Sequence, residues 1–257
     1  MSNRDHYYNR AKQEGYRARS AYKLQQLDEA AGLLGEGRTV VDLGAAPGGW
    51  LQVAAERVGP GGRVIGVDRQ RIDPVDADGP VETIRGDVTE DATVEAIEAA
   101  VGEAGADVVL SDVAPDMSGE YDLDHARSVH LARQSLEVAL ASLDAGGDLA
   151  VKVFDGRDLA DLEADVDAEF EYVRQVRPDA SRDASSELYL VAKGRLTAPV
   201  RGGDELTVEV VDTGSEGDGV AKVEDFTVFV PGGEPGETVD VRVTDVKPRF
   251  GFAERRE

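Results

Sequence analysis

The pattern of apolar residues changes near residue 194, and this change constrains the fold more than any other feature. Before it, from residue 39 onward, short apolar runs alternate with segments of helical period. After it, β-branched runs follow one another across glycine-rich turns. The first pattern is typical of a parallel sheet covered on both faces, and the second of a small barrel. We expect an α/β domain over residues 1–194 and an all-β domain over residues 195–257.

The first domain is expected to begin with a basic arm and a helix within residues 1–32, the helix itself lying at 18–32. Apolar runs then predict five strands, at residues 39–43, 63–68, 81–87, 107–112 and 148–154. Helices are expected from about residue 48 and at residues 91–101 and 123–143. Two further runs close the domain, at 171–178 and 187–194. In the second domain the strand-like runs lie at 206–212, 220–230 and 237–246.

Composition excludes several chemistries. The chain has no cysteine, so disulfides, cysteine-ligated metals and cysteine nucleophiles are ruled out. The three histidines, His6, His125 and His130, are scattered without a ligand pattern around them, and we expect no metal site. No run of eighteen apolar residues exists and the first residues lack a signal-peptide core. A cytoplasmic protein that does not enter a membrane is expected.

The net charge of the chain is −24, from 52 acidic and 28 basic side chains. Such a chain repels itself in dilute salt, but at about 1 M salt the Debye length is only about 3 Å. We therefore interpret the acidity as adaptation to a saline cytoplasm. The alternative is an acidic protein that binds cations or basic partners. Oligomeric state is not indicated by the sequence.

The first 25 residues have the opposite charge. They hold six basic side chains against two acidic ones, a local net charge of +4, with four tyrosines interleaved. This combination favours a nucleic-acid partner, through phosphate contacts and base stacking. Short basic arms of this kind are also often disordered.

A glycine-rich turn, VVDLGAAPGGW at residues 40–50, joins the first strand to its helix. Such a turn lets the backbone approach a ligand closely. Asp68 ends the second strand and is placed to accept ribose hydroxyls, while Asp87 ends the third and would receive an adenine amino group. Either acid could instead be a helix N-cap. The turn lacks GxGxxG, and the nearby acids suit the cationic sulfonium of adenosylmethionine better than they suit NAD.

One lysine interrupts an apolar strand. Lys152 lies in DLAVKVF, in a chain with 22 arginines and only 6 lysines, and burying an ammonium is costly unless a partner receives it. Asp112 ends the fourth strand, Glu187 begins the last run of the domain and Lys23 lies on the preceding helix. Because the carboxyl ends of parallel strands form the ligand crevice, we expect the strand-end residues to converge there.

Five segments, RARSAYKL, VVDLGAAPGGW, SDVAPDMSG, AVKVF and SSELYLV, resemble in order the motifs of the RrmJ/FtsJ-type ribosomal RNA 2′-O-ribose methyltransferases. The resemblance spans residues 6–193 and implies a Rossmann-like sheet, S-adenosyl-L-methionine as cofactor and a uridine of large-subunit (23S) rRNA as substrate; related members act on tRNA or mRNA caps. By motif match it implies a catalytic tetrad of Lys23, Asp112, Lys152 and Glu187. It likewise implies cofactor contacts at Gly48, Trp50, Asp68, Asp87 and Asp112.

The tail resembles a TRAM domain, a small OB-like RNA-binding barrel. Bacterial enzymes of the RrmJ type usually lack this tail, and its net charge here is −6 over residues 195–257. RNA binding by this domain must therefore depend on local patches of its surface and on base stacking. The alternative is that the domain serves stability or oligomerisation. Since salt weakens phosphate contacts steeply, we expect the RNA surface to involve Tyr22 with Arg17 and Arg19.

We hypothesise that Lys152 orients and deprotonates the 2′-hydroxyl, with Asp112 beside it. Burial and the second ammonium of Lys23 would both lower the pKa of such a lysine; the alternative is a structural pair with Glu187. A nicotinamide oxidoreductase and a base methyltransferase are disfavoured, because the required motifs or a cysteine are missing. A tRNA 2′-O-methyltransferase and a non-catalytic RNA-binding assembly factor remain alternatives.

Overall fold

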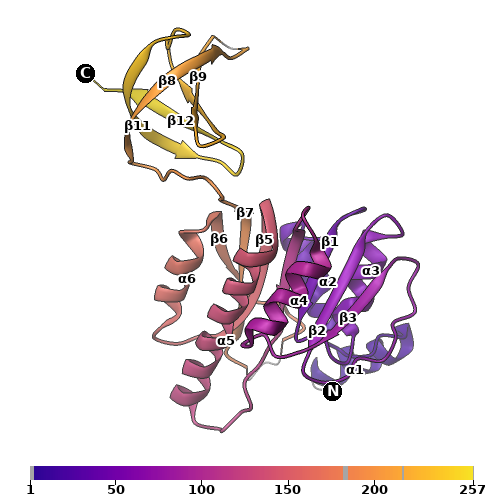
Figure 1. The fold of residues 1–257 in the computed structure, drawn as a ribbon. Helices are drawn as coiled ribbons and strands as arrows, with labels where there is room; N and C mark the ends of the chain where they lie inside the picture. Colours follow the sequence, from indigo (N-terminus) through magenta and orange to yellow (C-terminus); the bar gives the residue numbers. More distant parts are fainter. Residues whose placement is uncertain (1–2, 182–184, 216, 257) are drawn as a thin grey trace. The chain divides into compact units, whose positions relative to one another are not determined.

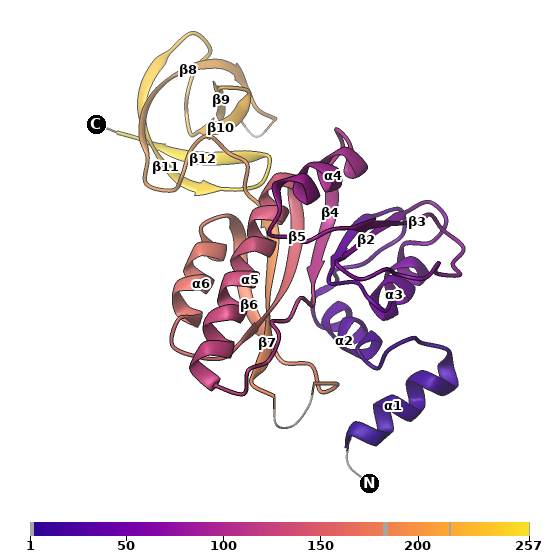
Figure 2. The same ribbon diagram turned by 60° about the horizontal axis from the view of Figure 1, so that its bottom comes forward.

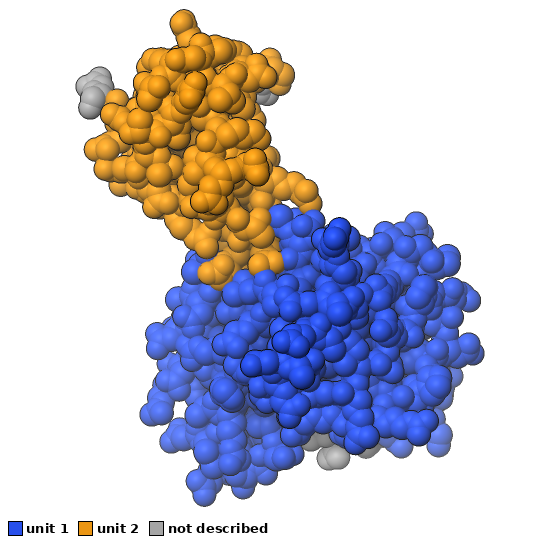
Figure 3. All heavy atoms as spheres, in the orientation of Figure 1, with its two compact units in different colours: residues 1–168, 172–193 blue, residues 169–171, 194–257 orange. Residues whose placement is uncertain are grey.

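The computed structural model describes residues 3–181, 185–215 and 217–256. The chain divides into two compact units, coloured separately in Figure 3. The first comprises residues 1–168 and 172–193, and the second comprises residues 169–171 and 194–257. Each unit has its own hydrophobic core.

The first unit is built on a seven-stranded sheet with the order β3-β2-β1-β4-β5-β7-β6 (Figure 1). Its strands are β1 (Thr39–Leu43), β2 (Arg63–Asp68), β3 (Val81–Arg85), β4 (Ala106–Ser111), β5 (Leu143–Phe154), β6 (Phe170–Val176) and β7 (Glu187–Arg195). The pairs among β1 to β5 are parallel, as expected. β7 departs from that expectation, because it runs antiparallel to β5.

The antiparallel direction of β7 has a consequence for the site. Phe154, the last residue of β5, pairs with Glu187, the first residue of β7, and Lys152 pairs with Tyr189. The beginning of β7 therefore lies at the carboxyl edge of the parallel strands. A strand in the other direction would have placed Glu187 at the opposite edge of the sheet.

Helices cover both faces of this sheet (Figures 1 and 2). Four follow the sequence expectation with small shifts at their ends: α2 (Ala21–Ala31), α3 (Gly49–Val58), α4 (Asp91–Val101) and α5 (Tyr121–Ser142). Two were not predicted: α1 (Asn3–Glu14), within the basic arm, and α6 (Leu159–Asp167). α2 packs beside α3, whereas α5 contacts both α4 and α6. In the described part of the chain no helix is long and apolar enough to cross a membrane.

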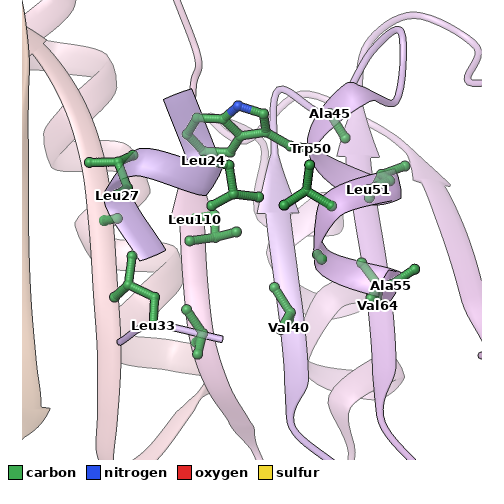
Figure 4. Packing of buried hydrophobic residues seen from close by; sticks show 14 of the residues in the cluster. Leu24, Leu27, Leu33, Val40, Ala45, Trp50, Leu51, Ala55, Val64 and Leu110 are labelled. Carbon is green, nitrogen blue, oxygen red and sulfur yellow. The ribbon is translucent and has the colours of Figure 1, made fainter. Parts of the chain in front are cut away.

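A hydrophobic core lies between the sheet and helices α2 and α3 (Figure 4). Leu24 and Leu27 of α2 are fully buried against it, and burying each leucine stabilises the fold by about 1.5–3 kcal/mol. The strands contribute Leu110, Ala150 and Tyr189 to the same core. Because side chains two residues apart share a face of a strand, the residues at 112, 152 and 187 are directed toward α2.

The second unit is a closed barrel with the strand order β10-β12-β11-β8-β9. Its strands are β8 (Glu205–Thr213), β9 (Gly219–Val223), β10 (Phe226–Val230), β11 (Thr238–Val246) and β12 (Phe250–Arg255). β12 was not predicted as a strand; it pairs antiparallel with β11 and parallel with β10, and so closes the barrel. Alternating valines fill the interior, as the β-branched runs indicated.

Candidate active site

Two pockets open at the carboxyl edge of the sheet, and both include Ala114 in their walls. The first, here called the acidic pocket, has a volume of about 430 Å³ and lies at the ends of β1 to β4. Asp68, Asp87 and Asp112 line it. The second, the lysine pocket, has a volume of about 310 Å³, and its wall includes Arg19, Lys23, Lys152 and Glu187.

The acids of the first pocket are held by backbone N–H groups. Asp68 accepts hydrogen bonds from Ala46 N at 2.9 Å and from Gln70 N at 2.8 Å, which ties the end of β2 to the glycine-rich turn. Asp87 accepts from the backbone and the hydroxyl of Thr89, at 3.1 and 2.8 Å. These hydrogen bonds, with a smaller effect of Arg69, lower the pKa of Asp87. An ionised carboxylate thus faces the pocket.

The glycine-rich turn passes close to the chain after β4. Gly44 has a φ of +76°, and a Cβ there would lie 3.0 Å from Val113 N. Glycine therefore leaves open a space that any other residue would fill. Arg17 joins the turn to the loop that follows β2, because its guanidinium donates to the carbonyls of Pro47, Asp73 and Pro74.

Gly48 and Trp50 do not line the acidic pocket. Gly48 lies at the start of α3 with a φ of +107°. The Trp50 ring is buried, its indole N–H donates to Ser20 O at 2.7 Å, and its centroid lies 5.9 Å from that of Tyr189. The structure thus brings the three predicted acids, Asp68, Asp87 and Asp112, together in one pocket. The contact of Gly48 and Trp50 with a cofactor stays a prediction.

The four predicted tetrad residues meet in the lysine pocket and at its border with the acidic pocket. Lys152 Nζ lies 2.9 Å from Asp112 Oδ1 and donates to Asp112 O at 2.6 Å. Lys23 Nζ lies 2.7 Å from Glu187 Oε1 and 3.8 Å from Asp112 Oδ1. Both lysine side chains are less than one tenth exposed. The alternative pairing of Lys152 with Glu187 is not what the structure contains, since Glu187 pairs with Lys23.

Tyr189 is a fifth member that the sequence interpretation missed. Its hydroxyl donates to Asp112 Oδ1 at 2.6 Å and accepts from Lys23 Nζ at 3.4 Å. The ring is fully buried, and burial first, then Asp112 and Glu187, raise the pKa of this phenol well above its usual value. The signal was present in the sequence, because Tyr189 follows Glu187 by two positions on a strand and so shares its face.

Two carboxyl groups near this edge, the partly buried Asp112 and the fully buried Asp42, have pKa values shifted in opposite directions. Burial alone would raise the pKa of Asp112, but Lys152, Lys23 and the Tyr189 hydroxyl together hold it below the usual value. Asp42, on β1, is completely buried, and neither carboxyl oxygen has a hydrogen-bond partner among the described residues. Burial, then the charges of Asp112 and Asp68, raise its pKa well above the usual value. The surroundings thus favour the ionised form of Asp112 and the protonated form of Asp42.

The structure corrects one expectation about the RNA surface. Tyr22 is 2% exposed, because the unpredicted helix α1 places Tyr7 against it, and its hydroxyl donates to Glu14 at 2.8 Å. It therefore belongs to the core and is not available for base stacking. Arg17 is engaged with the glycine-rich turn, as described above. Arg19 lines the lysine pocket.

Among the described residues, no group of three or more His, Asp or Glu side chains is placed to hold a metal ion. The acidic pocket instead combines ionised carboxylates with a close-approaching glycine turn. Those features suit hydroxyl donors and a positive charge. The lysine pocket suits a hydroxyl nucleophile, which an amine can orient and deprotonate.

Comparisons with known proteins match the two parts of the chain to two different families. The profile of the FtsJ-like methyltransferase family matches residues 16–195, and that of the TRAM domain matches residues 199–255. The chain is similar to the ribosomal RNA large subunit methyltransferase E of Haloarcula marismortui, with 68% identity over 99% of both chains. The protein of the same name from Methanosarcina mazei is 49% identical over 99% of this chain and 93% of that one.

A solved structure also resembles this chain over most of its length. The crystal structure of a putative ribosomal RNA methyltransferase from Plasmodium falciparum covers 70% of this chain and 98% of its own, with a TM-score of 0.62 and 28% identity.

Proposed function

The chain belongs to the FtsJ-like methyltransferase family and carries a TRAM domain, and from this premise we propose that it methylates the 2′-hydroxyl of a uridine in large-subunit (23S) ribosomal RNA. The observation that carries the proposal is the Lys152–Asp112 pair beside the acidic pocket. The names of the full-length relatives supply the class of RNA.

S-adenosyl-L-methionine is the cofactor that the acidic pocket fits. Asp68 would hold the ribose hydroxyls and Asp87 the adenine amino group, while Gly44 leaves room for the ligand against the backbone. Gly48 and Trp50 lie at the start of α3, directly after the glycine-rich turn, and we propose them as further contacts to the cofactor. When bound, the cofactor supplies a methyl group activated by its positive sulfonium.

Lys152 would orient the ribose and remove its proton. Asp112 holds Nζ at two points, its carboxylate and its own carbonyl, so the amine has a fixed direction at the pocket wall. With Lys152 as a neutral amine whose N–H groups point to Asp112, Nζ would take the proton of the 2′-hydroxyl while the oxygen bonds to the methyl carbon. The bond between the methyl group and sulfur would break in the same step, and the neutral thioether would leave. Fixing a base within hydrogen-bond distance of the proton it abstracts contributes about 10²–10⁴-fold in rate.

Lys23, Glu187 and Tyr189 would act around that pair. Lys23 joins Glu187 to Asp112, and the Tyr189 hydroxyl donates to the same oxygen of Asp112 that faces Lys152. Lys23 and the Tyr189 hydroxyl favour the ionised form of Asp112, and Glu187 holds the Lys23 ammonium in place beside it. We assign them positioning roles.

The barrel is proposed to hold RNA by stacking. Phe250 and Phe252 are more than one third exposed, and their rings lie 5.5 Å apart. Each also lies 5.8 Å from the ring of Phe229. Aromatic stacking does not depend on net positive charge, which this barrel lacks.

The decisive experiment incubates the protein with labelled adenosylmethionine and, separately, rRNA, large ribosomal subunits and tRNA, all lacking the modification. Digestion to nucleosides then identifies the product. We expect 2′-O-methyluridine from the large-subunit RNA. Label only in tRNA would move the activity to that substrate. Binding of rRNA without any label, in molar KCl that matches the acidic composition, would favour an assembly factor that is not an enzyme.

A further inference from the structure

A third pocket continues from the lysine pocket along the start of α5. Its volume is about 390 Å³, and its wall includes Met117, Tyr121, Asp124, His125, Phe154 and Ser185. Three of these residues, Met117, Phe154 and Ser185, also line the lysine pocket. We propose that this tyrosine pocket binds, by stacking, the base of a nucleotide next to the methylated one. The proposal rests on the function proposed above and adds a second nucleotide site to it.

The ionisable groups in the pocket are already used by the protein. His125 is buried, with Nδ1 2.9 Å from Phe154 O and Nε2 accepting from Asp158 N at 3.2 Å. Asp124 is buried as well, and its carboxylate accepts from the backbone N–H groups of Ser118 and Gly119. These groups shape the pocket. Among the described lining residues, both side chains are therefore already engaged with the protein itself.

The surface offered to a ligand is apolar and rigid. Tyr121 is 60% exposed, yet its hydroxyl donates to Asp155 O at 2.6 Å, so the ring is fixed at both ends. Met117 is 64% exposed beside it, on a loop that Asp124 holds. An exposed aromatic ring that is held in place loses little conformational freedom when a base stacks on it.

The position of the tyrosine pocket beside the lysine pocket, and the high salt concentration, both favour a nucleotide base as its ligand. A ribose in the lysine pocket directs its neighbour in the RNA chain into an adjoining pocket, and the shared walls make the tyrosine pocket such a neighbour. Stacking is worth about 1–3 kcal/mol per base and does not depend on base identity, since every base has a flat face. It also survives high salt, in which phosphate contacts weaken.

The test measures binding of a nine-nucleotide oligouridine by fluorescence anisotropy in molar KCl. Tyr121→Ala is expected to weaken binding about tenfold or more, within the range of one lost stacking interaction. Tyr121→Phe keeps the ring and should retain most of the affinity. The matched control is Tyr172→Ala, which removes another half-exposed tyrosine, on β6, and should bind as the wild type does.

Met117→Ala gives a second measurement if Tyr121→Ala does not fold, and it is expected to weaken binding in the same direction. Wild-type affinity in a folded Tyr121→Ala and in Met117→Ala would overturn the proposal. Methyl transfer to large-subunit rRNA is measured on the same preparations. Absence of methyl transfer by the wild-type protein would refute the proposed function. The oligouridine measurements test, independently of that activity, whether the tyrosine pocket binds a base.

Discussion

The acidic pocket and the lysine pocket lie at one edge of one sheet, yet their side chains are opposite in kind. The first presents the carboxylates of Asp68 and Asp87, held by backbone N–H groups. The second presents Lys23 and Lys152, both buried. Asp112 lies at the border, since it lines the acidic pocket and pairs with the lysines of the other.

This separation of charge suits a reaction between two partners of different polarity. A cationic donor is attracted by the carboxylates, and a hydroxyl nucleophile is met by amines that can hold its oxygen and take its proton. The comparison predicts that substitutions in the lysine pocket impair chemistry and leave cofactor binding intact. Substitutions in the acidic pocket are expected to do the reverse.

The largest effect is expected from Lys152→Ala. Loss of the amine should lower the rate of methyl transfer by about 10²–10⁴-fold, the usual contribution of a positioned base, with cofactor affinity unchanged by calorimetry. Lys152→Arg sharpens the result, because a guanidinium keeps the charge but does not give up its proton. We expect that variant to be inactive too; appreciable turnover would mean that Lys152 only orients the hydroxyl.

Lys193→Ala is the matched control for both variants. Lys193 is also a strand lysine in an ion pair, with the buried Asp148, but it lies in β7 beyond the pockets. Its removal tests whether the loss of a partly buried ion pair is enough to abolish activity. We expect methyl transfer to persist.

Asp68→Asn should have the next largest effect, on the other side of the comparison. A hydrogen bond to a charged group is worth about 1.5–3 kcal/mol, so the variant is expected to bind adenosylmethionine about tenfold to a hundredfold more weakly. Adenosylhomocysteine, which has the same ribose without the positive sulfur, should lose as much affinity. Asp76→Asn, at an exposed acid in the loop after β2, is the control. Equal affinities for Asp68→Asn and wild type would remove Asp68 from the site.

Much of this edge could be predicted from the sequence, because local signals determine it. Strand runs that end in Asp68 and Asp112 mark the carboxyl edge, and the bounds of β1 and β2 agree with the apolar runs. The direction of β7 could not be read in the same way, since an apolar run is the same in both directions. Its antiparallel pairing with β5 is a tertiary property, and it is what brings Glu187 to the lysines.

The structure of the basic arm also depends on tertiary contacts that its own sequence does not reveal. Its charge and tyrosines suggested a surface for RNA, but helix α1 forms there and buries Ala11 and Tyr22 together. Helical period is weak in so polar a segment, and the partner that makes the helix bury a face lies elsewhere in the chain. α6 differs, because its buried Leu159, Leu162 and Val166 have helical spacing that the sequence does contain.

A smaller effect on chemistry is expected from Tyr189→Phe. The change removes one hydrogen bond to Asp112, so we expect methyl transfer to slow by about tenfold, as for a bond to a charged group, without loss of cofactor affinity. Since that bond helps to lower the pKa of Asp112, the acid limb of the pH–rate profile should move to higher pH. Tyr22→Phe, which removes a similar bond to Glu14, should leave the profile where it is. An unshifted profile in Tyr189→Phe would show that the tyrosine is only part of the core.

The smallest effect concerns stability and Asp42, the carboxyl beneath the border of the two pockets. Because its pKa is raised in the folded state, the folded protein binds a proton that the unfolded chain releases at lower pH. Unfolding free energy should therefore fall as pH rises from the usual carboxyl pKa toward the raised one. Asp42→Asn removes this slope, so the variant should gain stability relative to the wild type as pH rises, measured by urea unfolding from about pH 4 to about pH 8. Asp107→Asn, at an exposed position on β4, controls for the loss of a carboxylate. Parallel pH profiles for Asp42→Asn and wild type would mean that Asp42 is ionised in the folded protein, and the separation of charge would then extend beneath the sheet edge into the core.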